Sequence, residues 1–292
     1  MSGGQSIRQY PLAIRCHDIT NAESRDLDPT SLHTSTSQQE RLQVDRVAET
    51  QAALASIFDR HTHAALAFSG GKDSLALLHL CRPYRDRLTA LWVNTGAMFP
   101  HMVEFVRRTV GWNFVELTSD LVDYWRQAGM PTSVMATDHV LGGRGEPLEP
   151  RMNGWTVCCA MLRMQPMRAW LASNPDVTVF LHGQRNSDAG RFRAEQILGG
   201  VRAEVVAPLW SWSDEDVSTY VDQHGIELPE QYSMGWHGSG ECAPCTAKLT
   251  PARLAYMRKR YPELAALTEQ RVRLIYETAI AAAQPELAAV QP

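Results

Sequence analysis

The sequence lacks any run of about 18 apolar residues, so no segment is expected to span a membrane as a helix. It also lacks a large charge of either sign: 28 Lys and Arg stand against 32 Asp and Glu, a formal net charge of −4. A polyanion would therefore have to meet a local basic patch rather than the chain as a whole. Residues 1–15 lack the long apolar core of a secretory signal, because Arg8 and Arg15 interrupt their short apolar stretches. We expect a cytoplasmic location.

Cysteine is scarce as well, with six in 292 residues, too few for a disulfide scaffold. Four of the six form two pairs, Cys158 with Cys159 and Cys242 with Cys245 in a Cys-x-x-Cys. Four thiolates suit an iron–sulfur cluster or a structural zinc ion. Neighbouring side chains on a helix diverge by about 100°, so adjacent cysteines reach a bulky cluster more readily than one small ion. Zinc stays open, as does a buried cysteine pair beside an unrelated Cys-x-x-Cys.

Short apolar runs alternate with helical patterns through most of the chain. The expected strands cover 64–68, 88–93, 114–117, 177–181 and 205–206, and the expected helices 38–60, 75–80, 102–110, 120–128, 158–171, 213–223 and 250–283. The Gly-, Pro- and Arg-rich segment 131–154 is expected to be a loop. This alternation predicts an α/β fold with a doubly wound parallel sheet and its ligand at the C-terminal ends of the strands. We expect a flexible arm (1–36), a nucleotide-binding domain with cluster loops (37–250) and a helical extension (251–292).

One hexapeptide, Ser69-Gly70-Gly71-Lys72-Asp73-Ser74, lies between an expected strand and an expected helix. Two glycines let the backbone turn tightly and approach an anion. The amide hydrogens at the start of the helix offer partial positive charge to a pyrophosphate. Lys72 adds a full charge, Ser69 and Ser74 add hydroxyl donors, and Asp73 adds a hard oxygen for Mg²⁺. The Walker A spacing is absent, yet the loop is expected to bind ATP with Mg²⁺.

This hexapeptide resembles the motif of the PP-loop ATP pyrophosphatase superfamily, whose members cleave ATP between the α- and β-phosphates. The resemblance implies that AMP is attached to an acceptor oxygen, which becomes a leaving group. It also implies that Lys72 and Asp73 are the catalytic residues. Lys72 and the loop amides would stabilise the charge on the departing pyrophosphate.

Two cysteine segments, residues 158–166 and 240–246, resemble the cluster-binding segments of the adenylylsulfate/phosphoadenylylsulfate reductase family. Members with paired cysteines hold a [4Fe-4S] cluster, which implies Cys158, Cys159, Cys242 and Cys245 as its ligands here. Further matching segments are Asn94-Thr95-Gly96 with Phe99, Pro100 and Glu104, then Gly183-Gln184-Arg185 with Asp188 and Arg191, then 208–210 and 212–217. The resemblance spans about residues 60–250 and implies that Thr95, Gly96, Arg185 and Arg191 help to bind the nucleotide.

Two features depart from that family. Its reductases use a further cysteine near the C-terminus, whereas no cysteine follows Cys245 here. The remaining two are Cys81, expected to pack in the core, and Cys16 in the arm, whose role stays open. The reductases also tend to have a degenerate phosphate loop, since their substrate is already an adenylate, whereas this loop is intact. The combination resembles the reductase-like component of DNA phosphorothioation systems, in which a cysteine desulfurase delivers the sulfur.

The sulfur acceptor stays open, because DNA phosphorothioation is implied by resemblance alone and tRNA thiolation is an alternative. Nucleic acid could bind through a partner subunit or through a local arginine patch consisting of Arg144, Arg151, Arg163, Arg168, Arg185, Arg191 and Arg193. The tryptophans expected to shield the cluster are Trp155, Trp210, Trp212 and Trp236, and structural histidines are expected at His182 and His237. Two other hypotheses remain: a sulfonucleotide reductase lacking its usual cysteine, and a non-catalytic ATP- and cluster-binding subunit of a DNA-modification complex. A homo-oligomer is also open.

Overall fold

The computed structural model describes residues 36–133, 150–188, 201–239 and 242–290. The described residues from Gln43 onward belong to one compact unit. The predicted arm, apart from Thr36, lies outside the described residues. Within the described ranges, no helix combines the length and apolar character needed to cross a membrane.

Five parallel strands form the central sheet, in the order β3-β2-β1-β6-β7. Their bounds are β1 Ala64–Ala67, β2 Leu88–Asn94, β3 Phe114–Thr118, β6 Val179–Leu181 and β7 Glu204–Val206. From β1 the chain continues to β2 and β3 on one side, and later to β6 and β7 on the other. This confirms the predicted doubly wound sheet. The strand order reverses between β1 and β6, the switch point at which such sheets bind ligands.

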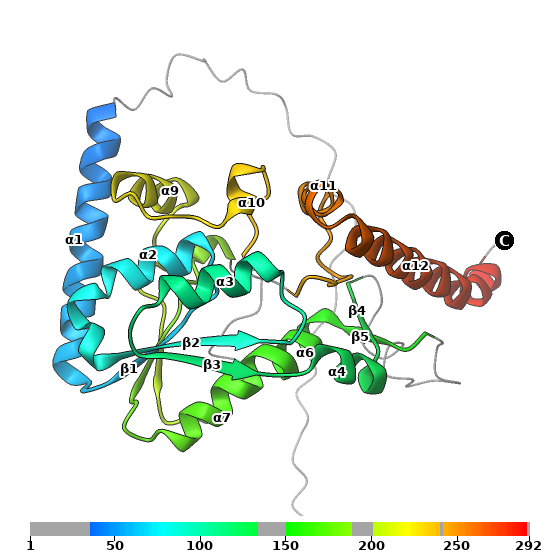
Figure 1. Ribbon diagram of the computed structural model, residues 1–292, viewed down its shortest axis with the longest axis horizontal. Coiled ribbons are helices and arrows are strands. Elements are labelled where there is room, and N and C mark those ends of the chain that lie inside the picture. The colour runs from blue at the N-terminus through cyan, green and yellow to red at the C-terminus, as the bar shows by residue number, and fades with distance from the viewer. Residues whose placement is uncertain (1–35, 134–149, 189–200, 240–241, 291–292) are drawn as a thin grey trace, which may run out of the picture. The chain divides into compact units, whose positions relative to one another are not determined.

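Helices cover both faces of the sheet (Figure 1). One face packs against α1 (Thr36–Arg60), α2 (Lys72–Leu80), α3 (Pro100–Thr109) and α9 (Asp214–Gln223), and the other against α7 (Gln165–Ser173). Side chains alternate along each strand as the pleat requires. In β1, Ala64 and Leu66 join the first core and Ala65 joins the second. Burial on both faces explains why β1 and β2 consist mainly of apolar residues.

Several elements differ from the sequence-based prediction. Segment 131–154 was expected to be a loop throughout, but its ends belong to two parallel paired strands, β4 (Met130–Thr132) and β5 (Met152–Gly154); its centre, 134–149, lies outside the described residues. Strands of three residues are too short to show alternation. The expected tail helix is two helices, α11 (Pro251–Arg260) and α12 (Pro262–Val290). A proline disfavours helical backbone in the residue before it, here Tyr261.

The predicted helix at 158–171 lies within one uninterrupted helical run, of which only the middle turn departs from α-helical geometry. Helix α6 (Trp155–Cys159) leads into a π-helical turn, η2 (Ala160–Met164), and α7 follows. Such π turns occur often at functional sites. The other elements are η1 (Arg82–Arg87), α4 (Leu121–Ala128), η3 (Asn186–Asp188) and α10 (Glu230–Ser233).

Candidate functional site

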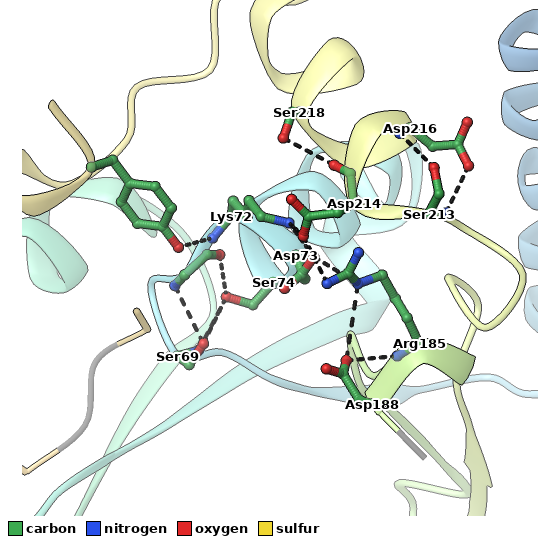
Figure 2. Close-up of polar contacts among 12 residues, drawn as sticks. Ser69, Lys72, Asp73, Ser74, Arg185, Asp188, Ser213, Asp214, Asp216 and Ser218 are labelled. Carbon is green, nitrogen blue, oxygen red and sulfur yellow. Dashed lines mark hydrogen bonds and ion pairs between the residues drawn. The ribbon is translucent and has the colours of Figure 1, made fainter. Parts of the chain in front are cut away.

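The hexapeptide 69–74 connects the C-terminal end of β1 to the first turn of α2, as predicted. Gly70 has φ +75°, in the region that glycine adopts without strain, and a Cβ there would lie 2.9 Å from side-chain atoms of α3. The Ser74 hydroxyl donates to the Gly71 carbonyl at 2.9 Å and lies 3.1 Å from the Ser69 hydroxyl (Figure 2). Both hydroxyls therefore help to shape the loop from within.

Four ionised side chains meet beside this loop, at the switch point (Figure 2). Lys72 Nζ lies 3.1 Å from Asp73 Oδ1 and 2.8 Å from Asp214 Oδ1. Arg185 contacts the same two oxygens, with Nε 3.2 Å from Asp73 and Nη2 3.0 Å from Asp214. Lys72 follows β1 and Arg185 follows β6. Each strand that flanks the switch point thus supplies one cation.

The cations of this group are buried and the carboxylates are not. The side chains of Lys72 and Arg185 are each 8% exposed, against 31% for Asp73 and 69% for Asp214. The hydrogen bond from Lys72, aided by the charge of Arg185, holds the pKa of Asp214 below its usual range. Arg185 Nη1 is buried and, within the described part of the chain, has no hydrogen-bond partner. Such a group can bind phosphate oxygens through its cations and Mg²⁺ through its carboxylates.

The loop after β6 touches the phosphate loop through glycine. A Cβ at Gly183 would lie 3.2 Å from the backbone of Asp73, so only glycine allows this approach without displacement. The Arg185 amide donates to Asp188 Oδ2 at 3.2 Å, which holds the turn. The Gln184 amide donates to the buried His182 ring at 3.4 Å, in keeping with a structural histidine. Arg191, the other predicted nucleotide ligand of this loop, lies outside the described residues.

Tyr232 of α10 reaches the phosphate loop from a later part of the chain. Its hydroxyl accepts the Lys72 backbone N–H at 3.0 Å, and burial raises its pKa to about 12. His237 stacks on its ring with centroids 5.7 Å apart, again in keeping with a structural histidine. A Cβ at Gly71 would lie 2.7 Å from that of Ser239, so this segment packs directly on the loop.

The four predicted metal ligands line a single cavity. Cys158 and Cys159 end α6, and Cys242 pairs with Met98 in an isolated antiparallel bridge beyond β2. The cavity is lined by all four cysteines, Cys158, Cys159, Cys242 and Cys245, together with Leu121, Trp125, Pro131, Trp155, Leu162, Arg163 and Lys248. In the described ranges, no three His, Cys, Asp or Glu side chains are arranged to hold a single metal ion. The structure thus brings the four thiols together without converging them on one point.

Burial dominates the chemistry of these thiols. It raises the pKa of Cys158 to about 12 and also raises that of Cys242. Thr95 Oγ1 lies 3.4 Å from the Cys242 sulfur and opposes this effect. Thr95 was predicted to bind nucleotide, whereas its side chain lies at the cysteine cavity. Gly96, predicted for the same role, turns the chain out of β2 with φ +72°.

One buried side chain of α11 organises the Cys-x-x-Cys backbone. Arg253 Nη2 donates to the carbonyls of Cys242 at 2.6 Å and Ala243 at 3.1 Å, and Nη1 donates to that of Lys248 at 3.2 Å. Its guanidinium carbon lies 5.7 and 5.4 Å from the centroids of two aromatic rings. Because it is wholly buried, this guanidinium holds the segment firmly.

The predicted shield of tryptophans is only partly correct. Trp155 lines the cysteine cavity, and Trp236 stacks on the Arg253 guanidinium. Trp212 does not face the cavity, because it packs in the core under α1 and its Nε1 donates to Thr50 at 2.9 Å. Trp210 is 38% exposed.

The predicted arginine patch is likewise divided. Arg163 lines the cavity, Arg185 belongs to the charged group at the switch point, and Arg151 and Arg168 are exposed. Arg144, Arg191 and Arg193 lie outside the described residues.

Cys81 is buried in the core, which raises its thiol pKa and agrees with a packing role. Cys16 lies outside the described residues.

Sequence reasoning missed four residues of these sites: Asp214, Tyr232, Trp125 and Arg253. Asp214 carried a signal, since it falls in a matching segment, but the segment was interpreted as a helix cap. Both roles hold, because Ser213 and Asp216 form the capping box of α9 while Asp214 contacts Lys72. The other three had no signal, because their roles arise from contacts between distant segments.

Comparison with known proteins agrees with this arrangement. Residues 63–248 match the family model described as the phosphoadenosine phosphosulfate reductase domain. The adenosine 5'-phosphosulfate reductase of Rhodococcus opacus is 25% identical over 184 residues, which cover 60% of this chain and 65% of that protein. The aligned region thus spans just under two thirds of that relative.

Two solved structures are similar to this chain at lower sequence identity. The phosphoadenylyl-sulfate reductase of Candida auris, in a phosphate complex, is 14% identical with a TM-score of 0.48, covering 71% of this chain and 95% of that one. The U34-tRNA thiolase NcsA of Methanococcus maripaludis, with its [4Fe-4S] cluster, is 15% identical with a TM-score of 0.44, covering 82% and 81%. The family match itself extends over more than half of the sequence and includes both the phosphate loop and the four cysteines, so this chain belongs to the phosphoadenosine phosphosulfate reductase domain family.

Proposed function

We propose that this chain cleaves ATP between the α- and β-phosphates and uses the resulting AMP group to drive sulfur transfer to nucleic acid, as in DNA phosphorothioation. The observation that carries the proposal is the intact phosphate loop, whose Lys72 joins Arg185, Asp73 and Asp214 at the switch point. An adenylyl sulfate has no β- or γ-phosphate. A glycine loop with two buried cations and two accessible carboxylates suits a triphosphate with Mg²⁺ better.

Each residue of the group has a role in this reaction. Lys72 and Arg185 would bind the β- and γ-phosphates, while the carboxylates of Asp73 and Asp214 would bind Mg²⁺. In this structure the Lys72 backbone N–H donates to the Tyr232 hydroxyl. A bound phosphate oxygen would accept from this N–H instead. An acceptor oxygen attacks the α-phosphorus, the bond to the α,β-bridging oxygen breaks, and pyrophosphate leaves with Mg²⁺. The two cations stabilise the charge that develops on it.

The second half of the reaction replaces oxygen by sulfur. A cysteine desulfurase supplies a persulfide, which a thiol reductant converts to hydrosulfide. The hydrosulfide attacks the activated phosphorus of the acceptor, a phosphorus–sulfur bond forms, and AMP leaves with the acceptor oxygen. The formal net charge of −4 gives the chain as a whole no attraction for DNA. The acceptor would therefore bind to exposed arginines such as Arg151 and Arg168, or to a partner subunit.

The cysteine cavity supports a [4Fe-4S] cluster over zinc. Zinc needs all four sulfurs at about 2.3 Å from one point, whereas the four thiolates of a cluster bind as a Cys₄ set around a larger body. The thiols of Cys158, Cys159, Cys242 and Cys245 share a cavity without converging on one ion position. When bound, such a cluster supplies redox-active iron with affinity for sulfur. Arg253 would hold the Cys-x-x-Cys backbone in place for it.

The test uses the full chain purified without oxygen and given ATP, duplex DNA, a cysteine desulfurase, cysteine and a thiol. We expect AMP and pyrophosphate in equal amounts together with phosphorothioate in the DNA. Lys72→Ala and Asp73→Ala should lose all three products, whereas Lys259→Ala, which removes an exposed lysine of α11, should not. Replacing DNA by tRNA tests the alternative acceptor. Absence of pyrophosphate with every acceptor would contradict the proposal.

A second candidate is sulfonucleotide reduction, which the family match and the relative named above favour. It predicts sulfite and AMP from adenylylsulfate with a thiol reductant, and no consumption of ATP. A non-catalytic subunit instead predicts ATP binding that depends on Lys72 without any turnover. The same preparation, given each nucleotide in turn, separates the three functions.

A further inference from the structure

Trp125 brings an unused hydrogen-bond donor to the cysteine cavity. The residue lies on α4 and lines the cavity. Its indole Nε1 is buried and has no hydrogen-bond partner among the residues described. Leaving a buried N–H without an acceptor costs about 1–3 kcal/mol, and folded proteins avoid it. A donor in this position indicates an acceptor that the cavity contents supply.

The donor faces sulfur. The indole N–H lies toward Cys158 but does not reach hydrogen-bond geometry. A neutral thiol is a weak acceptor, so the contact adds little as it stands. A thiolate or sulfide carries negative charge and accepts much more strongly. The N–H therefore gains a good partner when the sulfur in this cavity is anionic.

The indole is also held in place from its other side. The Arg271 guanidinium of α12 lies over the ring, 5.6 Å from its centroid. Burial lowers the pKa of Arg271, which shows that this cation lies partly inside the protein. Helix α4 itself is anchored by its cap, where Asp120 accepts the Asp123 amide at 2.8 Å. The contact with Arg271 thus restricts the movement of the indole ring.

We propose that Trp125 is a tuning residue that donates its indole N–H to anionic sulfur held in the cysteine cavity. The inference rests on the proposed cluster. Hydrogen bonds to the sulfurs of an iron–sulfur cluster are among the factors that set its reduction potential. Donation stabilises the reduced form, which carries more negative charge, and so raises the potential. Trp125 would make the cluster easier to reduce.

The test compares the wild type with Trp125→Phe after anaerobic reconstitution. Iron and sulfide per chain are measured first, and the midpoint potential follows from a titration monitored by electron paramagnetic resonance. We expect full iron content and a lower potential in the variant. Trp170→Phe makes the same chemical change on α7, where Trp170 is partly buried against the core beneath that helix, and should leave the potential unchanged.

A second replacement separates the lost N–H from lost packing. The tryptophan analogue 3-benzothienylalanine at position 125 keeps the shape of the ring and replaces only the N–H. It should lower the potential as Trp125→Phe does. An unchanged potential with full iron content would overturn the role of Trp125 and leave the proposed cluster standing. A wild type that binds no iron and sulfide would overturn both.

Discussion

The Lys72 ammonium lies 2.8 Å from the Asp214 carboxylate, which joins the first residue of α2 to the first residue of α9. Asp214 also accepts from Arg185 at 3.0 Å. One exposed acid therefore aligns the two buried cations on which phosphate binding would depend. The loop motif alone is an incomplete site, because its lysine is oriented by a residue far along the chain.

Asp214 should make stability depend on acid pH. Its pKa is lowered in the folded chain, so its ionised form stabilises the fold above the unfolded value of about 4, and this contribution is lost as the pH falls through the lower native pKa. We expect the free energy of unfolding to fall more steeply on acidification in the wild type than in Asp214→Asn. Urea unfolding at a series of pH values measures this. Asp86→Asn removes a carboxylate that is 93% exposed and should keep the wild-type slope.

Gly183 should be needed for the contact between the two loops of the switch point. A Cβ at this position meets the Asp73 backbone at 3.2 Å, and backbone cannot move aside as a flexible side chain can. We expect Gly183→Ala to displace the phosphate loop and weaken ATP binding, measured by titration calorimetry. Gly111→Ala has nothing within 4 Å of the new Cβ and should bind ATP as the wild type does. Equal affinities for the two variants would show that the contact is unimportant.

Arg253 should stabilise both the fold and the cysteine segment. In Arg253→Met the carbonyls of Cys242, Ala243 and Lys248 lose their donor, and the free energy of unfolding should fall by about 2–4 kcal/mol. Arg258→Met on the same helix removes an ion pair whose arginine is 62% exposed, and should cost about 0–1 kcal/mol. Chemical unfolding provides the values. A loss in Arg253→Met no larger than that in Arg258→Met would contradict the role given to this guanidinium.

The centre of the sheet was predictable because β1 and β2 are mostly buried and mainly apolar. The bounds of β1, β2 and β3 were predicted to within a residue. Neither β4 nor β5 was predicted, because the sequences Met-Pro-Thr and Met-Asn-Gly are not apolar runs like those that indicated β6 and β7. The break between α11 and α12 was missed because Pro262 lies inside an otherwise helical pattern.

The site was predictable where motifs are contiguous and not where contacts join distant segments. The hexapeptide and the cysteine pairs are local patterns. The structure places the hexapeptide between β1 and α2, and the cysteine pairs at the end of α6 and in the loop before α11. The orientation of Lys72 by Asp214 and of the Cys242 backbone by Arg253 depends on how helices pack. A one-dimensional pattern does not encode that pairing. Thr95 illustrates the same limit, because nothing in its motif indicated that its side chain would lie against Cys242.

The proposed function depends on which bond of ATP breaks, namely the one between the α-phosphorus and the α,β-bridging oxygen. The most direct measurement is product analysis by chromatography after the anaerobically purified chain has been incubated with ATP, Mg²⁺, an acceptor nucleic acid, a cysteine desulfurase, cysteine and a thiol, with Lys72→Ala and Lys259→Ala in parallel. We predict AMP and pyrophosphate in equal amounts from the wild type and Lys259→Ala, and neither from Lys72→Ala. ADP with inorganic phosphate, or intact ATP without pyrophosphate, would contradict the account.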